Sequence, residues 1–498
     1  MTIHTKFRGR RGRCVAAFVA AAALVGAGSA SANVPLTPVS TDPFTNATSQ
    51  HATEVEPDTF AFGSTVLATY QVGRFFNGGA SDIGFARSTD GGVTWDTSSF
   101  LPGLTFNAGP FADPSSPYER VSDPSVAYDA KHDTWMISSI PLLPGSLVVP
   151  TIFVSRSTDG GATFGTPVQI PPPAKKVNLD KNWTVCDNHA GSPFYGNCYT
   201  EFDNFGQGDL EYMSTSADGG RNWSTPVSPA GNPKGLGGQP VVQPNGTVIV
   251  PFESLKGTIA AFRSTDGGAT WSKEVPVSKI RFHPNSGGLR TSPLPTAEID
   301  AAGKAYVAWE DCRFEPKCTA NDIVFSTSTD GLTWSAVNRI PIDAVGSGVD
   351  HFIPGLAVDP ATSRSGHLAL TYYSYPNAAC TPATCQLNVG FVSSPDGGAT
   401  WSRSTQLAGP MSLADIAATS QGPMVGDYIS TSFNSTGSAA TVFAIGNPHT
   451  APVFDEGMWA PSTPLPVATA ATATLPATSA GAASGQGVGA ALQAIERH

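Results

Sequence analysis

The chain has 498 residues, of which 13% are charged, and a formal net charge of −11 at pH 7. An acidic chain that is poor in charge argues against nucleic acid or an anionic membrane surface as the main partner. The 52 Gly and 42 Pro residues, together with the near absence of helix-periodic stretches, predict many short strands joined by turns.

The N-terminus has the pattern of a secretory signal peptide. Basic residues between Lys6 and Arg13 precede an apolar run and the small residues Ala30-Ser31-Ala32, which predicts cleavage after Ala32 and a secreted mature chain. The apolar run is too short for a membrane span and no later stretch is long enough, so we expect no membrane span in the mature chain.

The remaining cysteines occur in three close pairs. Cys14 lies in the signal segment, and the pairs are Cys186 with Cys198, Cys312 with Cys318, and Cys380 with Cys385. In an oxidising compartment these pairs are expected to form three local disulfides, although six cysteines allow fifteen pairings.

One short motif recurs six times. The copies are RSTDGGVTW, RSTDGGATF, TSADGGRNW, RSTDGGATW, TSTDGLTW and SSPDGGATW, whose serines are Ser88, Ser157, Ser216, Ser264, Ser328 and Ser394. Each copy follows a β-rich run, and the spacing leaves room for one four-stranded sheet per copy. The pattern therefore predicts an all-β fold, a β-propeller with six blades that each carry the motif.

The segments around the repeats define the expected domain boundaries. Residues 1–32 are the signal peptide, residues 33–460 the propeller, and residues 461–498 a Pro/Ala/Thr/Ser/Gly tract expected to be disordered. The segments MVGDYISTSF and ATVFAIGN follow the last motif. They either form a seventh blade that lacks the motif or complete the ring together with N-terminal strands.

The motif is expected to shape a turn between two strands. A short Asp side chain accepts hydrogen bonds from its own turn, Gly adopts conformations that a Cβ would penalise, and the terminal aromatic ring packs between sheets. The alternative is that the six aspartates, Asp90, Asp159, Asp218, Asp266, Asp330 and Asp396, are catalytic or bind calcium.

The spacing Ser-x-Asp-x-Gly-x-Thr-Trp resembles the Asp box of the sialidase (neuraminidase) superfamily. Asn222 replaces Thr in the third copy, Phe164 replaces Trp in the second, and the fifth copy is one residue shorter. The resemblance implies a glycan substrate and a retaining exo-α-sialidase with a tyrosine nucleophile, without a cofactor or a catalytic metal.

Two segments near the start of the propeller resemble functional segments of that superfamily. GRFFNGGASD implies that Asp82 is the acid/base carboxylate and that Arg74 contacts the substrate. RVSDP implies that Arg120 and Asp123 lie at the substrate-binding site.

The nucleophile is expected late in the chain. VGDYISTSF offers Tyr428. An unperturbed phenol is almost wholly neutral at pH 7, so the tyrosine needs a carboxylate to accept its proton, and Glu298, Glu310 or the adjacent Asp427 is expected to do so. Arg313 is a further expected substrate contact, since a guanidinium fork suits a carboxylate better than Lys does.

Two departures from the superfamily keep other functions open. The Arg-Ile-Pro segment expected in the first strand is absent, and TYYSYPNAAC has no arginine where another is expected. The alternatives are a hydrolase or lyase that acts on a different sugar, and a non-catalytic propeller that binds glycans or a protein partner.

Overall fold

The computed structural model describes residues 34–173, 175–362, 366–450 and 453–480. The expected signal peptide and the last part of the expected tail, residues 481–498, lie outside these ranges. Across the described ranges, no helix has both the length and the apolar character that a membrane crossing needs.

The described chain is all-β and its sheets are antiparallel. Its helical elements are short 3-10 turns in connections between strands: η1 (Gly109–Phe111), η2 (Phe205–Gln207), η3 (Ser286–Gly288), η4 (Pro316–Cys318) and η5 (Leu413–Asp415). The expectation of an all-β fold from turn residues and short β-rich runs is confirmed.

The first half of the chain forms three sheets in sequence order. The strands of the first are β2 (Glu54–Phe62), β3 (Thr65–Arg74), β4 (Ala80–Ser88) and β5 (Ser99–Phe100), those of the second are β6 (Arg120–Asp129), β7 (Thr134–Leu142), β8 (Ile152–Ser157) and β9 (Val168–Ile170), and those of the third are β10 (Leu179–Cys186), β11 (Cys198–Asn204) and β12 (Leu210–Ser216). The first two sheets join through the single residue pair Ala80 and Val121.

Three further sheets follow the same order. The strands of the fourth are β13 (Gly235–Leu236), β14 (Val241–Val242), β15 (Val248–Ser254), β16 (Thr258–Ser264) and β17 (Val275–Lys279), those of the fifth are β18 (Thr296–Ile299), β19 (Ala305–Asp311), β20 (Asp322–Ser328) and β21 (Asn338–Arg339), and those of the sixth are β22 (Asp350–Val358), β23 (Leu368–Tyr375), β24 (Gln386–Ser394) and β26 (Thr405–Ser412).

The last sheet joins the two ends of the described chain. It contains β29 (Ser430–Phe433), β30 (Ser438–Gly446), β31 (Glu456–Pro461) and the N-terminal strand β1 (Leu36–Pro38), which pairs with β31. Of the two arrangements that the sequence left open, a separate last sheet and completion by an N-terminal strand, the described chain has features of both.

Short strands complete the remaining pairings. A hairpin of β27 (Ala418–Thr419) and β28 (Gly422–Pro423) precedes β29. Three short strands near the end of the described chain pair with earlier strands: β32 (Leu465–Pro466) pairs with β30, β33 (Leu475–Pro476) pairs with β25 (Thr400–Trp401), and β34 (Thr478–Ser479) pairs with β21. The described part of the expected disordered tail thus contributes backbone hydrogen bonds to sheet edges, which a low-complexity sequence can supply because the pairing needs no specific side chain.

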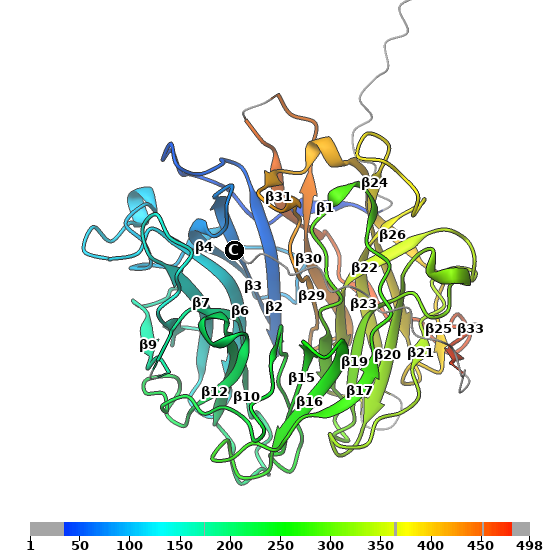
Figure 1. Ribbon diagram of the computed structural model, residues 1–498, viewed down its shortest axis with the longest axis horizontal. Helices are drawn as coiled ribbons and strands as arrows, with labels where there is room; N and C mark the ends of the chain where they lie inside the picture. Colours follow the sequence, from blue (N-terminus) through cyan, green and yellow to red (C-terminus); the bar gives the residue numbers. More distant parts are fainter. Residues whose placement is uncertain (1–33, 174, 363–365, 451–452, 481–498) are drawn as a thin grey trace, which may run out of the picture.

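The innermost strands of the sheets contact one another in turn around the middle of the molecule (Figure 1). The order of contacts is β2, β6, β10, β14, β18, β22 and β29, and β29 contacts β2 again. Side chains of these strands bond to the neighbouring strand: Asp58 accepts the Val126 N–H at 2.7 Å, and Thr296 accepts the Leu356 N–H at 3.2 Å. The centre of the molecule is therefore lined by polar groups of consecutive sheets.

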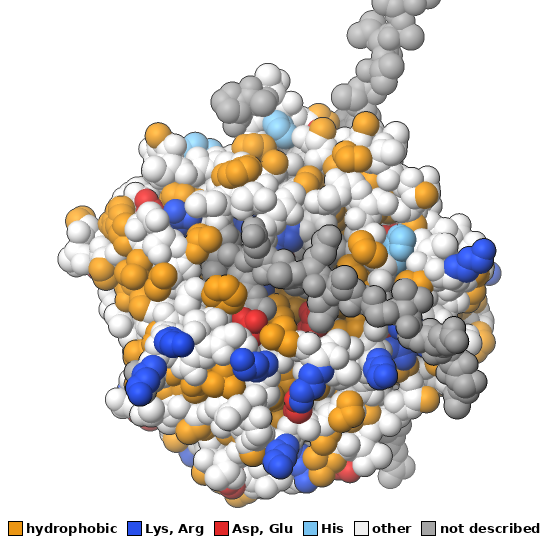
Figure 2. Space-filling view, in the orientation of Figure 1, with side chains coloured by type: hydrophobic (Ala, Val, Ile, Leu, Met, Phe, Trp, Pro, Cys, Tyr) orange, Lys and Arg blue, Asp and Glu red, His pale blue; other side chains and the backbone are white. Residues whose placement is uncertain are grey.

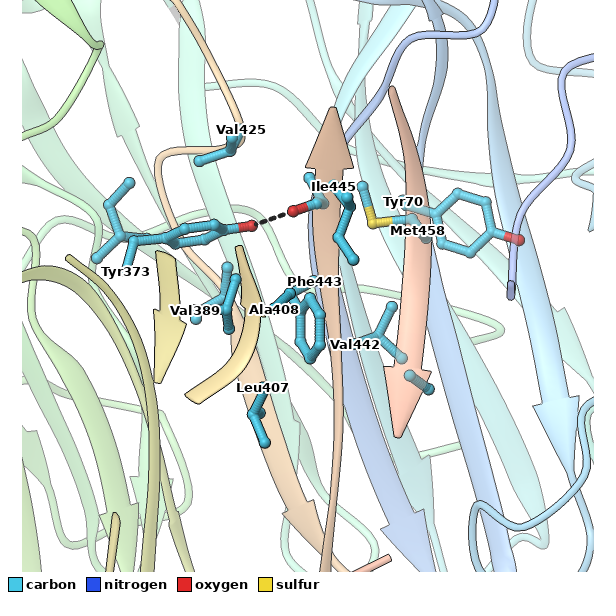
Figure 3. Packing of buried hydrophobic residues seen from close by; sticks show 14 of the residues in the cluster. Tyr70, Tyr373, Val389, Leu407, Ala408, Val425, Val442, Phe443, Ile445 and Met458 are labelled. Carbon is cyan, nitrogen blue, oxygen red and sulfur yellow. Dashed lines mark hydrogen bonds between the residues drawn. The ribbon is translucent and has the colours of Figure 1, made fainter. Parts of the chain in front are cut away.

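The largest apolar core lies between the sixth, last and first sheets (Figure 3). Tyr373 of β23 and Val389 of β24 face Phe443 of β30, and Tyr70 of β3 lies beyond Met458 of β31. The Tyr373 hydroxyl donates to the Ala444 carbonyl at 2.9 Å, which satisfies the one polar atom of this buried ring. Burial of these side chains holds the first and last strands of the described chain to the sixth sheet.

The six Asp boxes share one hydrogen-bond pattern. In the first, Asp90 Oδ1 accepts the Thr94 N–H at 2.8 Å and Oδ2 accepts the Thr94 hydroxyl at 2.6 Å, while Ser88 Oγ accepts the Gly92 N–H at 2.8 Å. In the third copy the Asn222 side-chain amide takes the place of the hydroxyl and donates to Asp218 at 2.6 Å. Each aspartate bonds within its own turn, as expected of a structural motif.

The three expected disulfides are present: Cys186–Cys198, Cys312–Cys318 and Cys380–Cys385. The first links β10 to β11 at directly paired positions, and the other two close short loops. Local pairing follows from the spacing, because cysteines this close in sequence need little chain rearrangement to meet.

Candidate functional site

The candidate site is built from irregularities that recur in the innermost strands. The pairing register shifts after Val55 in β2, after Ser122 in β6 and after Asp180 in β10. The residues at these bulges, Glu56, Asp123 and Lys181, have positive φ of 55°, 49° and 51°. A positive φ is costly for a residue other than Gly, and bulges redirect a side chain, so the strands use local strain to place charged groups in the middle of the molecule.

Lys181 lies at the centre of this group. Its Nζ is 3.4 Å from an oxygen of Asp123 and 3.8 Å from one of Glu56, and it donates a hydrogen bond to Asp427. Only 5% of Lys181 is exposed. Burial lowers the pKa of the amine, but the charges of Asp123, Asp427 and Glu56 outweigh burial and raise it, so Lys181 remains protonated.

Arg290 holds Asp427 from the other side. Its Nε donates to Asp427 Oδ1 at 2.7 Å and its Nη2 donates to Oδ2, which is a two-point contact. Burial raises the pKa of Asp427, but the Arg290 and Lys181 charges outweigh it and hold that pKa well below its usual range. Asp427 is therefore a poor proton acceptor at neutral pH.

Arg74 adds a third buried cation near the group. Its Nη1 donates to Gln71 at 3.2 Å, and the Gln71 amide in turn donates to Glu56. Burial and the charge of Arg290 lower the pKa of Arg74, whereas Glu56 and Asp427 raise it. Three cations and three carboxylates thus act on one another in a buried site.

Tyr428 lies directly beside this charged group. Its hydroxyl donates to the Pro124 carbonyl at 3.1 Å, its ring meets Trp183 edge to face with centroids 5.2 Å apart, and Lys181 Nζ is 5.9 Å from its ring centroid. Burial and the charges of Glu56 and Asp123 raise its pKa, so the phenol is neutral in this arrangement.

Three carboxyl groups of the innermost strands titrate near neutrality. Burial and the charge of Asp123 raise the pKa of Glu56 to about 7, and burial raises that of Asp58 to about 7. Burial and the charge of Asp58 raise the pKa of the partly buried Glu298 to about 8. Groups with such pKa values can exchange protons at physiological pH, which acid/base chemistry requires.

A small pocket opens onto the charged group. Lys181 and Asp427 form its polar wall, and Trp183 and Tyr428 form its aromatic wall. The remaining lining residues belong to β10 and to segments of the fourth to sixth sheets: Asn182, Gly237, Gly238, Gln239, Leu294, Pro295 and Pro354. In Figure 2, acidic side chains are visible near the middle of the face and basic side chains are spread over its lower half. A pocket with apolar walls and a few convergent polar groups is typical of a small-molecule site.

The structure brings together several of the expected site residues. Asp123 and Tyr428 lie at the charged group, and Arg74 interacts with it electrostatically. Glu298 is affected by the charge of Asp58, which also acts on Tyr428. The adjacent Asp427, expected as one possible proton acceptor, is held by Arg290 and Lys181.

The remaining expected residues have other surroundings. Asp82 is buried in β4, where it accepts the Ile83 N–H at 2.8 Å, and Glu310 is buried in β19 near Asp350 and Glu253, whose charges add to burial in raising its pKa. Among the described interactions, none joins either carboxylate to Tyr428.

The two remaining arginines have local partners. Arg120 donates to Asn77 at 2.8 Å and packs on the Phe75 ring, and Arg313 makes a two-point contact with Asp311 at 2.8 and 2.7 Å. Within the described part of the chain, their hydrogen bonds and ion pairs do not involve the pocket residues.

Sequence reasoning did not assign Lys181 or Glu56 to the site, and Arg290 was only one of several arginines that it considered as substrate contacts. The sequence does carry one indication of these bulges. A proline follows the bulged residue at Glu56-Pro57, Asp123-Pro124 and Ile353-Pro354, whereas Lys181 is followed by Asn182. A charged residue before Pro in the first strand of consecutive repeats marks a strained strand position. Because no proline follows Lys181, its strained position could not be predicted from this pattern.

A cluster outside the pocket has metal-ligand residue types. Asp322, Asp343 and His351 lie close enough to share an ion. Arg339 already occupies this place, since it donates to Asp322 at 2.7 Å and to Asp343 at 2.6 Å. The two carboxylates of the cluster are therefore already paired with a cation of β21.

Comparisons with known proteins show what this chain is similar to. The family model of the BNR repeat-like domain matches residues 199–355. A sialidase from Bacteroides fragilis is 24% identical over 288 residues, which are 53% of this chain and 49% of the relative, and a xyloglucanase from a Paenibacillus species is 26% identical over 304 residues, 55% of this chain and 27% of the relative. This chain thus spans half or less of the length of these curated relatives.

The solved structures to which this chain is similar include two sialidases. A Hadza microbial sialidase, Hz136, has a TM-score of 0.45 and 19% identity, covering 65% of this chain and 64% of its own. The NanB sialidase from Streptococcus pneumoniae has a TM-score of 0.42 and 14% identity, covering 86% of this chain and 71% of its own. In its six Asp boxes and its match to the BNR repeat-like model, the chain is similar to proteins of the sialidase/BNR-repeat superfamily.

Proposed function

We propose that this protein is a secreted glycoside hydrolase of the retaining exo-α-sialidase type, which acts on glycans at the pocket between Lys181 and Tyr428. The observation that carries the proposal is the convergence of a buried tyrosine, titratable carboxyl groups and buried cations at one pocket. The superfamily and the sialidase relative support glycoside hydrolysis as the class of reaction.

The proposed architecture is a propeller with the pocket at its centre. The first six sheets each carry an Asp box, and the last sheet, β29, β30, β31 and β1, is proposed as a seventh blade without one. Support comes from the cycle of contacts among the innermost strands, which returns from β29 to β2. Pairing of β1 with β31 then closes the ring with residues from both ends of the described chain.

Tyr428 is proposed as the nucleophile. Its oxygen attacks the anomeric carbon while the bond to the leaving oxygen breaks, and water later hydrolyses the glycosyl–tyrosine bond with net retention. Because its pKa is raised, the phenol has to lose its proton during the attack. Glu56 suits this step best, since its charge acts on Tyr428 and its pKa is about 7.

The leaving oxygen needs a proton donor. Glu298 is proposed for this role, because with a pKa of about 8 it is largely protonated at neutral pH. Asp82, the acid expected from the superfamily resemblance, is the second candidate, and burial likewise raises its pKa. Comparing Glu298→Gln with Asp82→Asn on substrates with poor leaving groups distinguishes the two, since an amide cannot deliver the proton.

Export of the protein is proposed from the N-terminal sequence. Three disulfides are consistent with folding in an oxidising compartment. Edman sequencing of the secreted protein is expected to begin at Asn33 after cleavage following Ala32.

One observation favours a second candidate, a hydrolase acting on an uncharged sugar. Both oxygens of Asp427 already neutralise Arg290 and Lys181, so these cations are not free for the carboxylate of a sialic acid. The half-buried Trp183 offers an aromatic face at the same pocket, a common surface for sugar rings.

The test is a comparison of fluorogenic α-sialosides with neutral glycosides between about pH 4 and 8. Tyr428→Phe is expected to abolish nearly all turnover of whichever substrate is cleaved, because it removes the attacking oxygen and keeps the ring. The matched control is Tyr375→Phe, since the buried Tyr375 hydroxyl has no hydrogen-bond partner among the described residues. Cleavage of neutral glycosides alone supports the second candidate. Absence of all turnover contradicts a hydrolase, and a glycan array then tests for a binding propeller.

A further inference from the structure

Asp427 occupies the place that a ligand carboxylate would take at the pocket. It lies outside any strand, between β28 and β29, and accepts hydrogen bonds on Oδ1 from Arg290 and on Oδ2 from Arg290 and Lys181. The three side chains come from distant parts of the chain and none is more than 8% exposed. A two-point guanidinium contact is a strong and specific way to bind a carboxylate, and a nearby ammonium adds a further charge-assisted hydrogen bond.

The backbone before Asp427 is shaped to deliver this side chain. Gly426 has a φ of 142°, and a Cβ there would lie 2.9 Å from the Tyr428 carbonyl oxygen and 3.0 Å from the Glu56 backbone. The Asp427 N–H donates to Glu56 at 3.3 Å. The carboxylate is thus carried by a short connection that crosses the site, whereas Lys181 lies within a strand.

The two cations depend on Asp427 to different degrees. Lys181 also has Asp123 at 3.4 Å and Glu56 at 3.8 Å. Arg290 has no other ion-pair partner among the described residues, and its charge acts unfavourably on Arg74. Without the Asp427 carboxylate, Arg290 and Arg74 would be two buried like charges with a strong tendency to take up an anion.

We propose that Arg290 and Lys181 form a binding site for a carboxylate, and that Asp427 closes it as an internal competitor. An acidic ligand occupies the site only where Asp427 is displaced. Lys181 and Asp427 both line the pocket, so the space that Asp427 leaves is reached from there. Only the identification of the ligand as an acidic sugar rests on the proposed function. Binding of a simple carboxylate such as acetate does not require that the protein is an active enzyme.

The experiment measures the melting temperature of Asp427→Ala in sodium acetate and in sodium chloride at equal ionic strength and pH 7. The variant is expected to melt several degrees below the wild type in chloride, and acetate is expected to restore most of this loss with saturation, because binding to the native state stabilises it. The wild type is expected to respond equally to both salts, since its site is filled.

Two controls make the outcome specific. Arg290→Met/Asp427→Ala lacks the two-point contact and is expected to show no acetate effect. Asp123→Asn leaves Asp427 in place, so its melting temperature is also expected to be the same in both salts. An equal acetate response in the double variant, or no acetate response in folded Asp427→Ala, overturns the proposal.

If Asp427→Ala does not accumulate as folded protein, the unfolded variant is refolded in sodium acetate and in sodium chloride, and the amount of folded protein is compared. Recovery of folded variant in acetate but not in chloride supports the proposal, and equal or absent recovery in the two salts overturns it. Failure of the glycosidase assay leaves these results unaffected, whereas an active enzyme whose Asp427→Ala variant ignores acetate refutes this proposal alone.

Discussion

At the scale of single residues, several charged side chains are buried beside the pocket, where loss of hydration is energetically unfavourable. Glu56, Asp123 and Asp427 neutralise Lys181, and removal of one partner leaves buried charge without compensation. The arrangement is expensive compared with an apolar core, so its presence at a pocket points to a role other than stability alone.

Replacing the central amine tests this reasoning. Lys181→Met retains a side chain of similar length and is expected to lower the free energy of unfolding by about 3–5 kcal/mol, because three buried carboxylates lose a common partner. Urea unfolding gives the value. The control is Lys256→Met, whose ion pair with Glu274 involves a lysine side chain that is 71% exposed, and a change below about 1 kcal/mol is expected there. Similar losses in the two variants would contradict the account.

A second residue, Glu54, links stability to pH. Burial and the charges of Asp42 and Asp455 raise its pKa from 4.5 to about 8, although the Ser40 hydroxyl bonds to it at 2.8 Å. Between these two values the unfolded chain has released the proton that the native state still binds. The stabilisation is complete below about pH 4.5 and is lost as the pH rises toward about 8.

Glu54→Gln removes this titration and keeps an oxygen that accepts from Ser40. From pH 5 to 8, the free energy of unfolding of the wild type is expected to fall more steeply than that of the variant, by up to about 1.4 kcal/mol per pH unit. Urea unfolding at pH 5, 6.5 and 8 measures the difference. Parallel pH curves for the two proteins would rule out the linkage.

At the scale of elements, the Asp boxes are turns that fix the connection between two strands of a sheet. Asp266 accepts the Thr270 N–H at 2.9 Å and the Thr270 hydroxyl at 2.5 Å. Burial raises the pKa of Asp266, but these hydrogen bonds outweigh burial and lower that pKa. The ionised carboxylate is therefore the form that accepts the hydrogen bonds. The sequence predicted this turn well, because its hydrogen bonds are all local.

Asp266→Asn is expected to lower the free energy of unfolding by about 1–2 kcal/mol, since the amide cannot accept the same set of bonds. Turnover per folded molecule is expected to stay unchanged. Denaturant unfolding and active-site titration measure the two quantities, and Asp96→Asn, at an exposed ion pair with Arg87, is the control with little expected effect. Loss of turnover in fully folded Asp266→Asn would instead favour a catalytic Asp box.

At the scale of the whole molecule, long-range pairing limited what the sequence could predict. Repeat spacing predicted sheets in chain order and left the pairing of an N-terminal strand with the last strands as one of two alternatives. The observed pair, Leu36 with Pro461, could not be chosen in advance, because no local pattern links positions so far apart. The site shows the same limit. Tyr428 and Asp123 were expected from short local segments, whereas Lys181 and Arg290 are joined by Asp427, which lies far from both in the sequence.

The central claim, that Tyr428 forms a covalent bond to the sugar, is tested most directly by trapping that intermediate. A fluorinated analogue of the cleaved sugar, which attaches quickly and hydrolyses slowly, is incubated with the protein, and the digested peptides are weighed by mass spectrometry. The account predicts one added glycosyl unit on Tyr428, and none in Tyr428→Phe. A glycosyl unit on another residue, or turnover without any covalent adduct, would contradict it.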